Sequence, residues 1–172
     1  MIAPLEAEGG NGQMARILRI DHIAVAVKDV DAGIASYQKI LGAELIEKAE
    51  LSIMGNRMSA AYLKIGDGLV VLDGAVEPDG FIAKFIEKRG EGLHHIGIVV
   101  DDLDAYVREL EAAGVRIAHR ESLGPLRREI LLSPKDLCGV VVQVIEWKEG
   151  DAPTPPARIA RLQRFLRSRT EP

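Results

Sequence analysis

Hydrophobic and polar positions along this chain follow two periods, one typical of strands and one typical of helices. Apolar and polar residues alternate over residues 19–27, where β-branched residues are frequent, and this pattern predicts a half-buried strand. Over residues 30–41 the apolar positions recur at i, i+3, i+4 and i+7, which predicts an amphipathic helix. Asp29 or Asp31 can cap this helix, and Gly42 can end it.

A hairpin is predicted after this helix. Residues 58–65 and 69–72 read as strands joined across Gly66-Asp67-Gly68, a sequence typical of tight turns. A further strand fits residues 43–51. The first half of the chain therefore reads as strand, helix and strands.

The second half repeats the first. Residues 93–105 match residues 20–32 without a gap, each lying 73 positions after its counterpart. The repeat predicts a strand at 94–100, a helix from about 103 to 113 with Gly114 as its stop, and strands near 116–118, 129–132 and 140–147. Two such units bury their shared face by packing together, which predicts an α+β fold with a curved sheet around a cleft.

Two histidines occupy the same position of this repeat, His22 in the first unit and His95 in the second. Equivalent residues of a repeated fold lie on equivalent sides of a pseudo-symmetric site, so the two imidazoles can share one metal ion. Strand alternation predicts that His94, next to His95, points to the opposite side and is structural.

Composition is that of a compact globular domain. The chain has 172 residues, of which 47% are hydrophobic and 28% charged, and it contains no apolar run long enough for a membrane span. The Gly-rich start has no hydrophobic signal region, and the single cysteine, Cys138, fits a reducing compartment, so we expect a cytoplasmic protein. A formal charge of -4 and an aromatic content of 4% argue against a nucleic-acid surface.

Three segments resemble the vicinal oxygen chelate superfamily, which includes glyoxalase I, extradiol dioxygenases, bleomycin-resistance proteins and methylmalonyl-CoA epimerases. They are residues 21–27, residues 82–95, and residues 133–136 leading to 139–142. The resemblance is nearest to the epimerases. It implies two βαβββ modules in tandem, forming a curved, cleft-enclosing mixed sheet with helices outside.

The resemblance also implies a divalent metal site, with His22, Val71, His95 and Gln143 at the ligand positions. Val71 cannot ligate, and Gln143 offers a neutral amide oxygen where the family has a carboxylate. The predicted ligands are therefore His22, His95 and Gln143, with cobalt, nickel, zinc, manganese and iron left open. A base position of one family branch falls near Ala60, which is inert.

Other residues are candidates for catalysis or substrate binding. We take Asp73 and Glu121 as candidate catalytic carboxylates, and Tyr62, His119 and Arg127 as candidate substrate-binding residues. Asp73 lies two residues after Val71, so strand alternation puts it on the same face. Each also has a structural alternative, as a turn, packed or exposed side chain.

The expected organisation has three parts. Residues 1–17 form a flexible extension, residues 18–148 form the domain with modules at 18–75 and 92–148, and residues 149–172 form a linker and a basic amphipathic helix. Over 157–167 this helix has apolar residues on one side and arginines beside them. The apolar residues are Ile159, Leu162, Phe165 and Leu166, and the arginines are Arg158, Arg161, Arg164 and Arg167. This pattern predicts that the helix packs on its own domain or across a dimer.

Three functional classes remain open. The first is a metal-dependent isomerase or lyase acting through an enolate on a small acyl-CoA or 2-oxo acid. The second is a non-haem iron dioxygenase, which ordinarily needs a carboxylate at position 143. The third is a metal-free protein that binds a small molecule in the cleft. The family resemblance implies a homodimer for each, and we expect no nucleic-acid or membrane partner.

Overall fold

The structure is a computed structural model that describes residues 15–150 and 154–170, with side chains described up to residue 164. Most of the predicted N-terminal extension and part of the predicted linker lie outside these residues. The strands are β1 Ile17–Val27, β2 Glu44–Ile53, β3 Asn56–Ile65, β4 Gly68–Ala75, β5 Gly92–Val100, β6 Ile117–Ser122, β7 Arg127–Leu132 and β8 Val141–Trp147. The helices are α1 Val30–Leu41, α2 Phe81–Arg89, α3 Leu103–Ala112 and α4 Pro155–Thr170.

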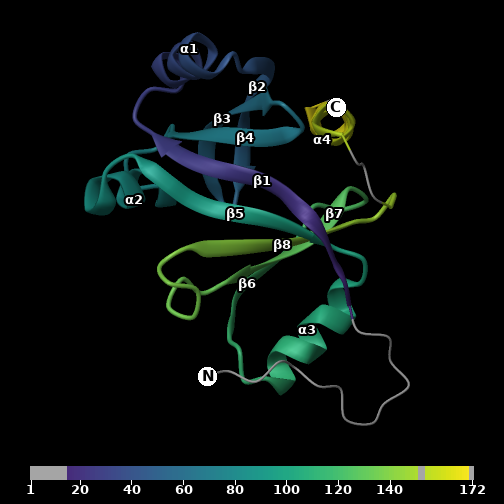
Figure 1. Ribbon diagram of the computed structural model, residues 1–172. Helices are drawn as coiled ribbons and strands as arrows, with labels where there is room; N and C mark the ends of the chain where they lie inside the picture. The colour runs from purple at the N-terminus through teal and green to yellow at the C-terminus, as the bar shows by residue number, and fades with distance from the viewer. Residues whose placement is uncertain (1–14, 151–153, 171–172) are drawn as a thin grey trace.

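One curved mixed sheet contains all eight of these strands, in the order β2-β3-β4-β1-β5-β8-β7-β6 (Figure 1). β1 pairs in parallel with β4, and β5 pairs in parallel with β8. The two halves meet where β1 and β5 run antiparallel. The predicted α+β fold of two tandem βαβββ modules is confirmed, and the first strand of each module lies at the centre of the sheet.

Helices α1 and α3 cover the outer face of the sheet. Ile34 of α1 packs with Leu63 and Leu72, and Val107 of α3 packs with Val144 in the equivalent cluster of the second module. Asp29, one of the two predicted caps, caps α1 by accepting a hydrogen bond from the backbone of Ala32. The repeat in the sequence is therefore a repeat in packing.

Helix α2 was not predicted. Its apolar residues, Phe81, Ile82, Phe85 and Ile86, recur at helical spacing between charged residues. This stretch was assigned by its resemblance to the family instead of by its periodicity. The helix contacts β1, β4 and β5, and Phe81 and Phe85 pack around the side chain of His94.

Helix α4 packs against the concave face of the sheet, beside β2. Ile159 and Leu162 are buried there with residues of the concave core. Arg158 is also buried, although the sequence pattern placed it among the basic residues of the helix. Ile159 and Leu162 therefore pack on their own domain, one of the two predicted arrangements, while the side chains of Phe165, Leu166 and Arg167 lie outside those that the structure describes. None of the described helices is long and apolar enough to cross a membrane.

Gly74 is expected to be intolerant of a side chain, because α1 approaches β4 closely there. A Cβ at this position would lie 2.4 Å from Cγ2 of Val30. We therefore expect Gly74→Ala to lower the free energy of unfolding by about 1–3 kcal/mol through overpacking. Urea unfolding measures this change. Adding Val30→Ala should make the two effects less than additive, and full additivity would contradict the steric explanation.

Candidate metal and catalytic site

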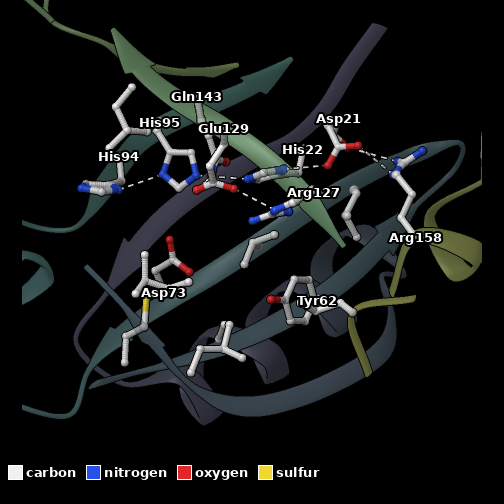
Figure 2. A pocket seen from close by; sticks show the side chains of 18 of the residues that line it. Asp21, His22, Tyr62, Asp73, His94, His95, Arg127, Glu129, Gln143 and Arg158 are labelled. Atoms are coloured by element: carbon white, nitrogen blue, oxygen red, sulfur yellow. Dashed lines mark hydrogen bonds and ion pairs between the residues drawn. The ribbon is translucent and has the colours of Figure 1, made fainter. Parts of the chain in front are cut away.

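The concave face of the sheet encloses a cavity of about 100 Å³ below α4. Its apolar wall includes Met58, Val71 and Leu162. The polar side chains that line it are Asp21, His22, Tyr62, Asp73, His94, His95, Arg127, Glu129, Gln143 and Arg158 (Figure 2). Both modules and α4 therefore contribute polar groups to one enclosed site.

A bulge in β5 brings His94 into the cavity. Ala24 of β1 pairs with His95, but Val25 pairs with Leu93, so His94 is an extra residue in the ladder. A bulge interrupts the regular alternation and re-aims a side chain. The Nδ1 atoms of His94 and His95 lie 2.9 Å apart. The prediction that His94 points to the opposite side is therefore wrong, because it assumed a regular strand.

Four side chains form one hydrogen-bonded chain across β1 and β5 (Figure 2). Asp21 Oδ2 lies 3.0 Å from His22 Nδ1, and His22 Nε2 lies 3.0 Å from His95 Nε2. His94 completes the chain at Nδ1 of His95. Asp21 directly precedes His22, and His94 directly precedes His95. The residues that hydrogen-bond to the two candidate ligands are therefore also equivalent in the repeat. This equivalence was present in the sequence and was not used.

The carboxylate of Asp21 sets the tautomer of His22. An ionised carboxylate only accepts hydrogen bonds, so Nδ1 of His22 donates and its Nε2 keeps a lone pair toward His95. Burial alone would raise the pKa of Asp21, but the hydrogen bond to His22 and nearby positive charge, including Arg158, hold it at about 2. Asp21 therefore stays ionised across the physiological range.

His94 and His95 are neutral at physiological pH. Burial lowers the pKa of His94 to about 4. Burial and the neighbouring His22 lower the pKa of His95 well below its usual range. Neutral imidazole is the form that binds metal ions.

Gln143 is oriented by a neighbour that the sequence analysis did not identify. Its Nε2 donates to Glu129 Oε1 at 2.7 Å, while its Oε1 is buried and has no hydrogen-bond partner among the described residues. Arg127 Nε lies 2.8 Å from the other carboxylate oxygen of Glu129. Glu129 thus fixes the amide of Gln143, which makes its oxygen a better ligand than an isolated glutamine offers.

These donors fit a divalent ion. Two imidazole nitrogens at 3.0 Å are close to the separation of about 3 Å expected for neighbouring ligands with metal–nitrogen bonds of about 2.0–2.1 Å. The unpaired oxygen of Gln143 is a third donor in the same cavity. The residues present therefore suit the metal that the resemblance implies.

A second candidate ligand set shares His95. One ligand atom each from Asp73, His94 and His95 lie within 4.8 Å of one another. Two histidines and one carboxylate are a common donor set for divalent transition metals. Replacing His22 or His94 separately distinguishes the two sets.

Asp73 lines the cavity from β4. It pairs across the β3–β4 ladder with Ala60, the apolar residue near the base position that the resemblance to one family branch implies. Only 3% of Asp73 is exposed, and its side chain makes no hydrogen bond or ion pair with any described residue. Burial raises the pKa of Asp73 to about 8. A buried carboxyl with a pKa near neutrality suits proton transfer.

Two of the predicted substrate-binding residues line the cavity, and one predicted catalytic residue does not. Tyr62 and Arg127 both lie in its wall, and burial raises the pKa of the Tyr62 hydroxyl. His119 and Glu121 lie on β6 instead of in the predicted loop, 3.9 Å from each other, and are not among the residues that line the cavity. β6 is the edge strand of the second module and is separated from β5, which carries His95, by β8 and β7.

Comparison with known proteins identifies similar sequences and structures. Residues 19–144 match the Glyoxalase/Bleomycin resistance protein/Dioxygenase superfamily. The chain is 32% identical over 145 residues to the mitochondrial methylmalonyl-CoA epimerase of Bos taurus, covering 83% of this chain and 82% of that protein.

Solved structures of similar proteins have the same fold. The methylmalonyl-CoA epimerase of Mycobacterium tuberculosis has a TM-score of 0.68 at 30% identity, covering 76% of this chain and 88% of that one. A methylmalonyl-CoA epimerase variant of Streptomyces coelicolor, in complex with 2-nitronate-propionyl-CoA, has a TM-score of 0.67 at 31% identity, covering 77% of this chain and 99% of that one.

Proposed function

This chain belongs to the Glyoxalase/Bleomycin resistance protein/Dioxygenase superfamily, and from that membership we propose that it is an acyl-CoA epimerase. Such an enzyme removes the proton from the carbon next to a thioester and returns a proton to the opposite face. Similar proteins are methylmalonyl-CoA epimerases, and one solved relative has an acyl-CoA analogue bound. The observation that carries the proposal is the buried carboxyl of Asp73 beside a pair of neutral histidines.

We assign the proton transfer on one side of the substrate to Asp73. Its cross-strand position beside Ala60 replaces the lost base by a carboxyl on the neighbouring strand. A base works best when its pKa lies near the operating pH, and burial supplies that condition here. In the free site most of this group is protonated at neutral pH, so it can also return a proton.

Glu129 is the carboxyl of the second module that faces the same cavity. It is buried, and its two oxygens contact Gln143 and Arg127. Asp73 lies on β4 and Glu129 on β7, so the two carboxyls come from different modules. This arrangement suits a reaction that needs proton transfer on two faces of one carbon, and we assign the second face to Glu129.

His22, His95 and Gln143 would hold a divalent ion in this enzyme. When bound, the ion would act as a Lewis acid for the enolate oxygen. Asp21 and Glu129 keep the donor atoms oriented before the ion arrives. Cobalt, nickel, zinc, manganese and iron all accept imidazole and oxygen ligands, so the choice among them is an experimental one.

Arg127 is the group that would bind an anionic part of the acyl chain. Its guanidinium is buried in the cavity wall, 5.4 Å from the Trp147 ring centroid, and it pairs with Glu129. A planar guanidinium can bind a second carboxylate through its remaining N–H groups. Tyr62 would line the pocket for the acyl group.

Exchange of the substrate's α-proton tests the proposed activity. The full-length protein, loaded with cobalt, would be incubated with methylmalonyl-CoA and ethylmalonyl-CoA in D₂O, and NMR would follow deuterium at the acyl α-carbon against an enzyme-free control. We expect exchange far above the control rate. Background-level exchange by metal-loaded protein would reject the epimerase proposal and favour a dioxygenase, which oxygen uptake would test. If the protein showed neither activity and bound no metal, the result would favour a metal-free binding protein.

A homodimer is also part of the proposal. The central strands expose apolar residues that are not among those lining the cavity, namely Ile17, Leu18, Ile20, Ile23 and Leu93. A patch of this kind on a sheet suits an interface with a second copy. Light scattering after size-exclusion chromatography would measure the mass.

A cytoplasmic location remains a prediction, to be tested by fractionation.

A further inference from the structure

We propose that Arg158, supplied by the C-terminal helix α4, is a positioning residue that holds Asp21 and, through it, the ring of His22. Helix α4 begins at Pro155, beyond the residues 19–144 that match the superfamily. A helix outside the matched residues therefore reaches the site. The inference rests on the proposed role of His22 as a metal ligand.

The guanidinium of Arg158 contacts two oxygens of Asp21. Its Nε lies 3.1 Å from Oδ1, and its Nη2 donates to the backbone oxygen at 3.1 Å. The remaining carboxylate oxygen, Oδ2, accepts the hydrogen bond from His22 Nδ1. The fork of the arginine thus fixes both the backbone and the carboxylate of Asp21, and the carboxylate fixes the imidazole.

Burial makes this contact consequential. Asp21 is 3% exposed and Arg158 is 2% exposed. Removing one member of a buried ion pair leaves the other charge uncompensated, which is strongly destabilising. Arg19 lies near the same carboxylate at 3.5 Å, but 19% of its side chain is exposed. Arg158 is therefore the more deeply buried cationic partner of Asp21.

The second module orients its histidine without such a charge. His94, the repeat equivalent of Asp21, packs between Phe81 and Phe85, with ring centroids 5.9 and 4.9 Å away. Aromatic packing can hold a neutral ring, whereas a buried carboxylate needs a cation. This difference between the modules explains why only the His22 side needs an arginine from outside the repeat.

Backbone packing fixes the opposite side of the His22 ring. A Cβ at Gly97 would lie 2.5 Å from Cε1 of His22, so the ring lies directly against the bare backbone of β5. The His22 ring is thus held by the backbone at Gly97 on one side and by Asp21 at its Nδ1 atom. Small shifts of Asp21 are therefore transmitted to Nε2 of His22, which faces His95.

The apolar residues of α4 place Arg158 at this point. Ile159 and Leu162 are buried in the concave core and line the cavity, and Gln163 donates a hydrogen bond to Glu47 of β2. Docking of the helix and insertion of the guanidinium are therefore one packing event. The helix closes the cavity and supplies a positioning residue at the same time.

Cobalt affinity of the full-length protein tests the inference. We expect Arg158→Met to weaken Co²⁺ binding by about 10-fold, the lower end of the usual effect of losing an outer partner of a metal ligand, because Arg158 acts on His22 through Asp21. Arg158→Lys should recover part of this loss, because it restores the charge without the fork. Arg161→Met is the matched control, since Arg161 lies on the same helix and contacts Glu149 and Gly150; it should change the affinity by less than about twofold.

A double-mutant cycle shows whether Arg158 acts through Asp21. Once Asp21→Asn is present, adding Arg158→Met should cause little further loss of affinity. Additive losses, or unchanged affinity in a folded Arg158→Met variant, would overturn the inference.

The tautomer of His22 in metal-free protein gives a second readout, by long-range ¹H–¹⁵N NMR. We expect the Nδ1–H form in the native sequence and a mixture in Arg158→Met. A single unchanged tautomer in both would overturn the positioning role. Because this readout needs neither metal nor substrate, it stays decisive if the chain has no epimerase activity.

Discussion

Replacing Asp73 by Asn should lower kcat for acyl-CoA epimerisation by about 100- to 10,000-fold, the usual contribution of a general base. The substitution keeps the size and the hydrogen-bonding shape of the side chain but removes the titratable oxygen. Asp73 is buried and has no hydrogen-bond or ion-pair partner among the described residues, so the substitution should break no such contact. Steady-state kinetics with cobalt-loaded protein measures the effect.

Asp67→Asn is the matched control for this variant. Asp67 lies in the exposed turn between β3 and β4, on the same hairpin, and its replacement should leave kcat unchanged within about twofold. A normal kcat in Asp73→Asn, with the metal content of the native protein, would remove Asp73 from the chemistry. Glu129, the carboxyl assigned to the second face, would then be the next to test.

The same substitution should alter how stability depends on pH. Asp73 has a pKa of about 8 in the folded protein, against an ordinary value of 3.8 for an exposed aspartate, so between these values the folded state binds more protons than the unfolded state. Stability of the metal-free native sequence therefore falls as pH rises through that window, and Asp73→Asn should not show this part of the fall. Chemical unfolding at several pH values in chelator compares the two proteins; parallel curves would contradict the raised pKa.

Replacing His95 by Ala should abolish metal binding and, with it, epimerase activity. His95 contributes to both candidate ligand sets, because its Nε2 faces His22 and its Nδ1 faces His94. Loss of an outer partner costs about 10- to 100-fold in metal affinity, and loss of a ligand should cost more. Elemental mass spectrometry of untagged protein should show a near-stoichiometric divalent metal in the native sequence and almost none in His95→Ala.

Two further substitutions separate the ligand sets. If His22, His95 and Gln143 hold the ion, His22→Gln should lose it and His94→Gln should keep most of it. The opposite result would move the ion to Asp73, His94 and His95, and Asp73 would then be a ligand instead of a base. Metal retained in His95→Ala would exclude both sets.

Local patterns in the sequence determined the architecture. Alternation and helical spacing placed most of the strands and helices, because each depends on residues within one element. The gap-free repeat located His22 and His95 at equivalent positions, and strand alternation from Val71 placed Asp73 in the same cavity. The family resemblance indicated the epimerase class, which the comparisons support.

Interactions between distant residues decided the remaining features of the site. Arg158 contacts Asp21, which lies 137 positions earlier in the sequence, and Glu129 of β7 contacts Gln143 of β8. Neither pair has a periodic signal, because a side chain's partner depends on which elements pack together. The bulge at His94 is similar, since only the pairing of β5 with β1 shows the extra residue.

Local sequence patterns were sufficient to predict the two-module α+β fold and the equivalent positions of His22 and His95. Packing between separate elements determines which groups orient those histidines, that Asp73 lies beside Ala60 in the cavity, and that α4 closes the cavity. Alternation and helical spacing depend on residues within one element, whereas ion pairs and buried hydrogen bonds form only after separate elements meet.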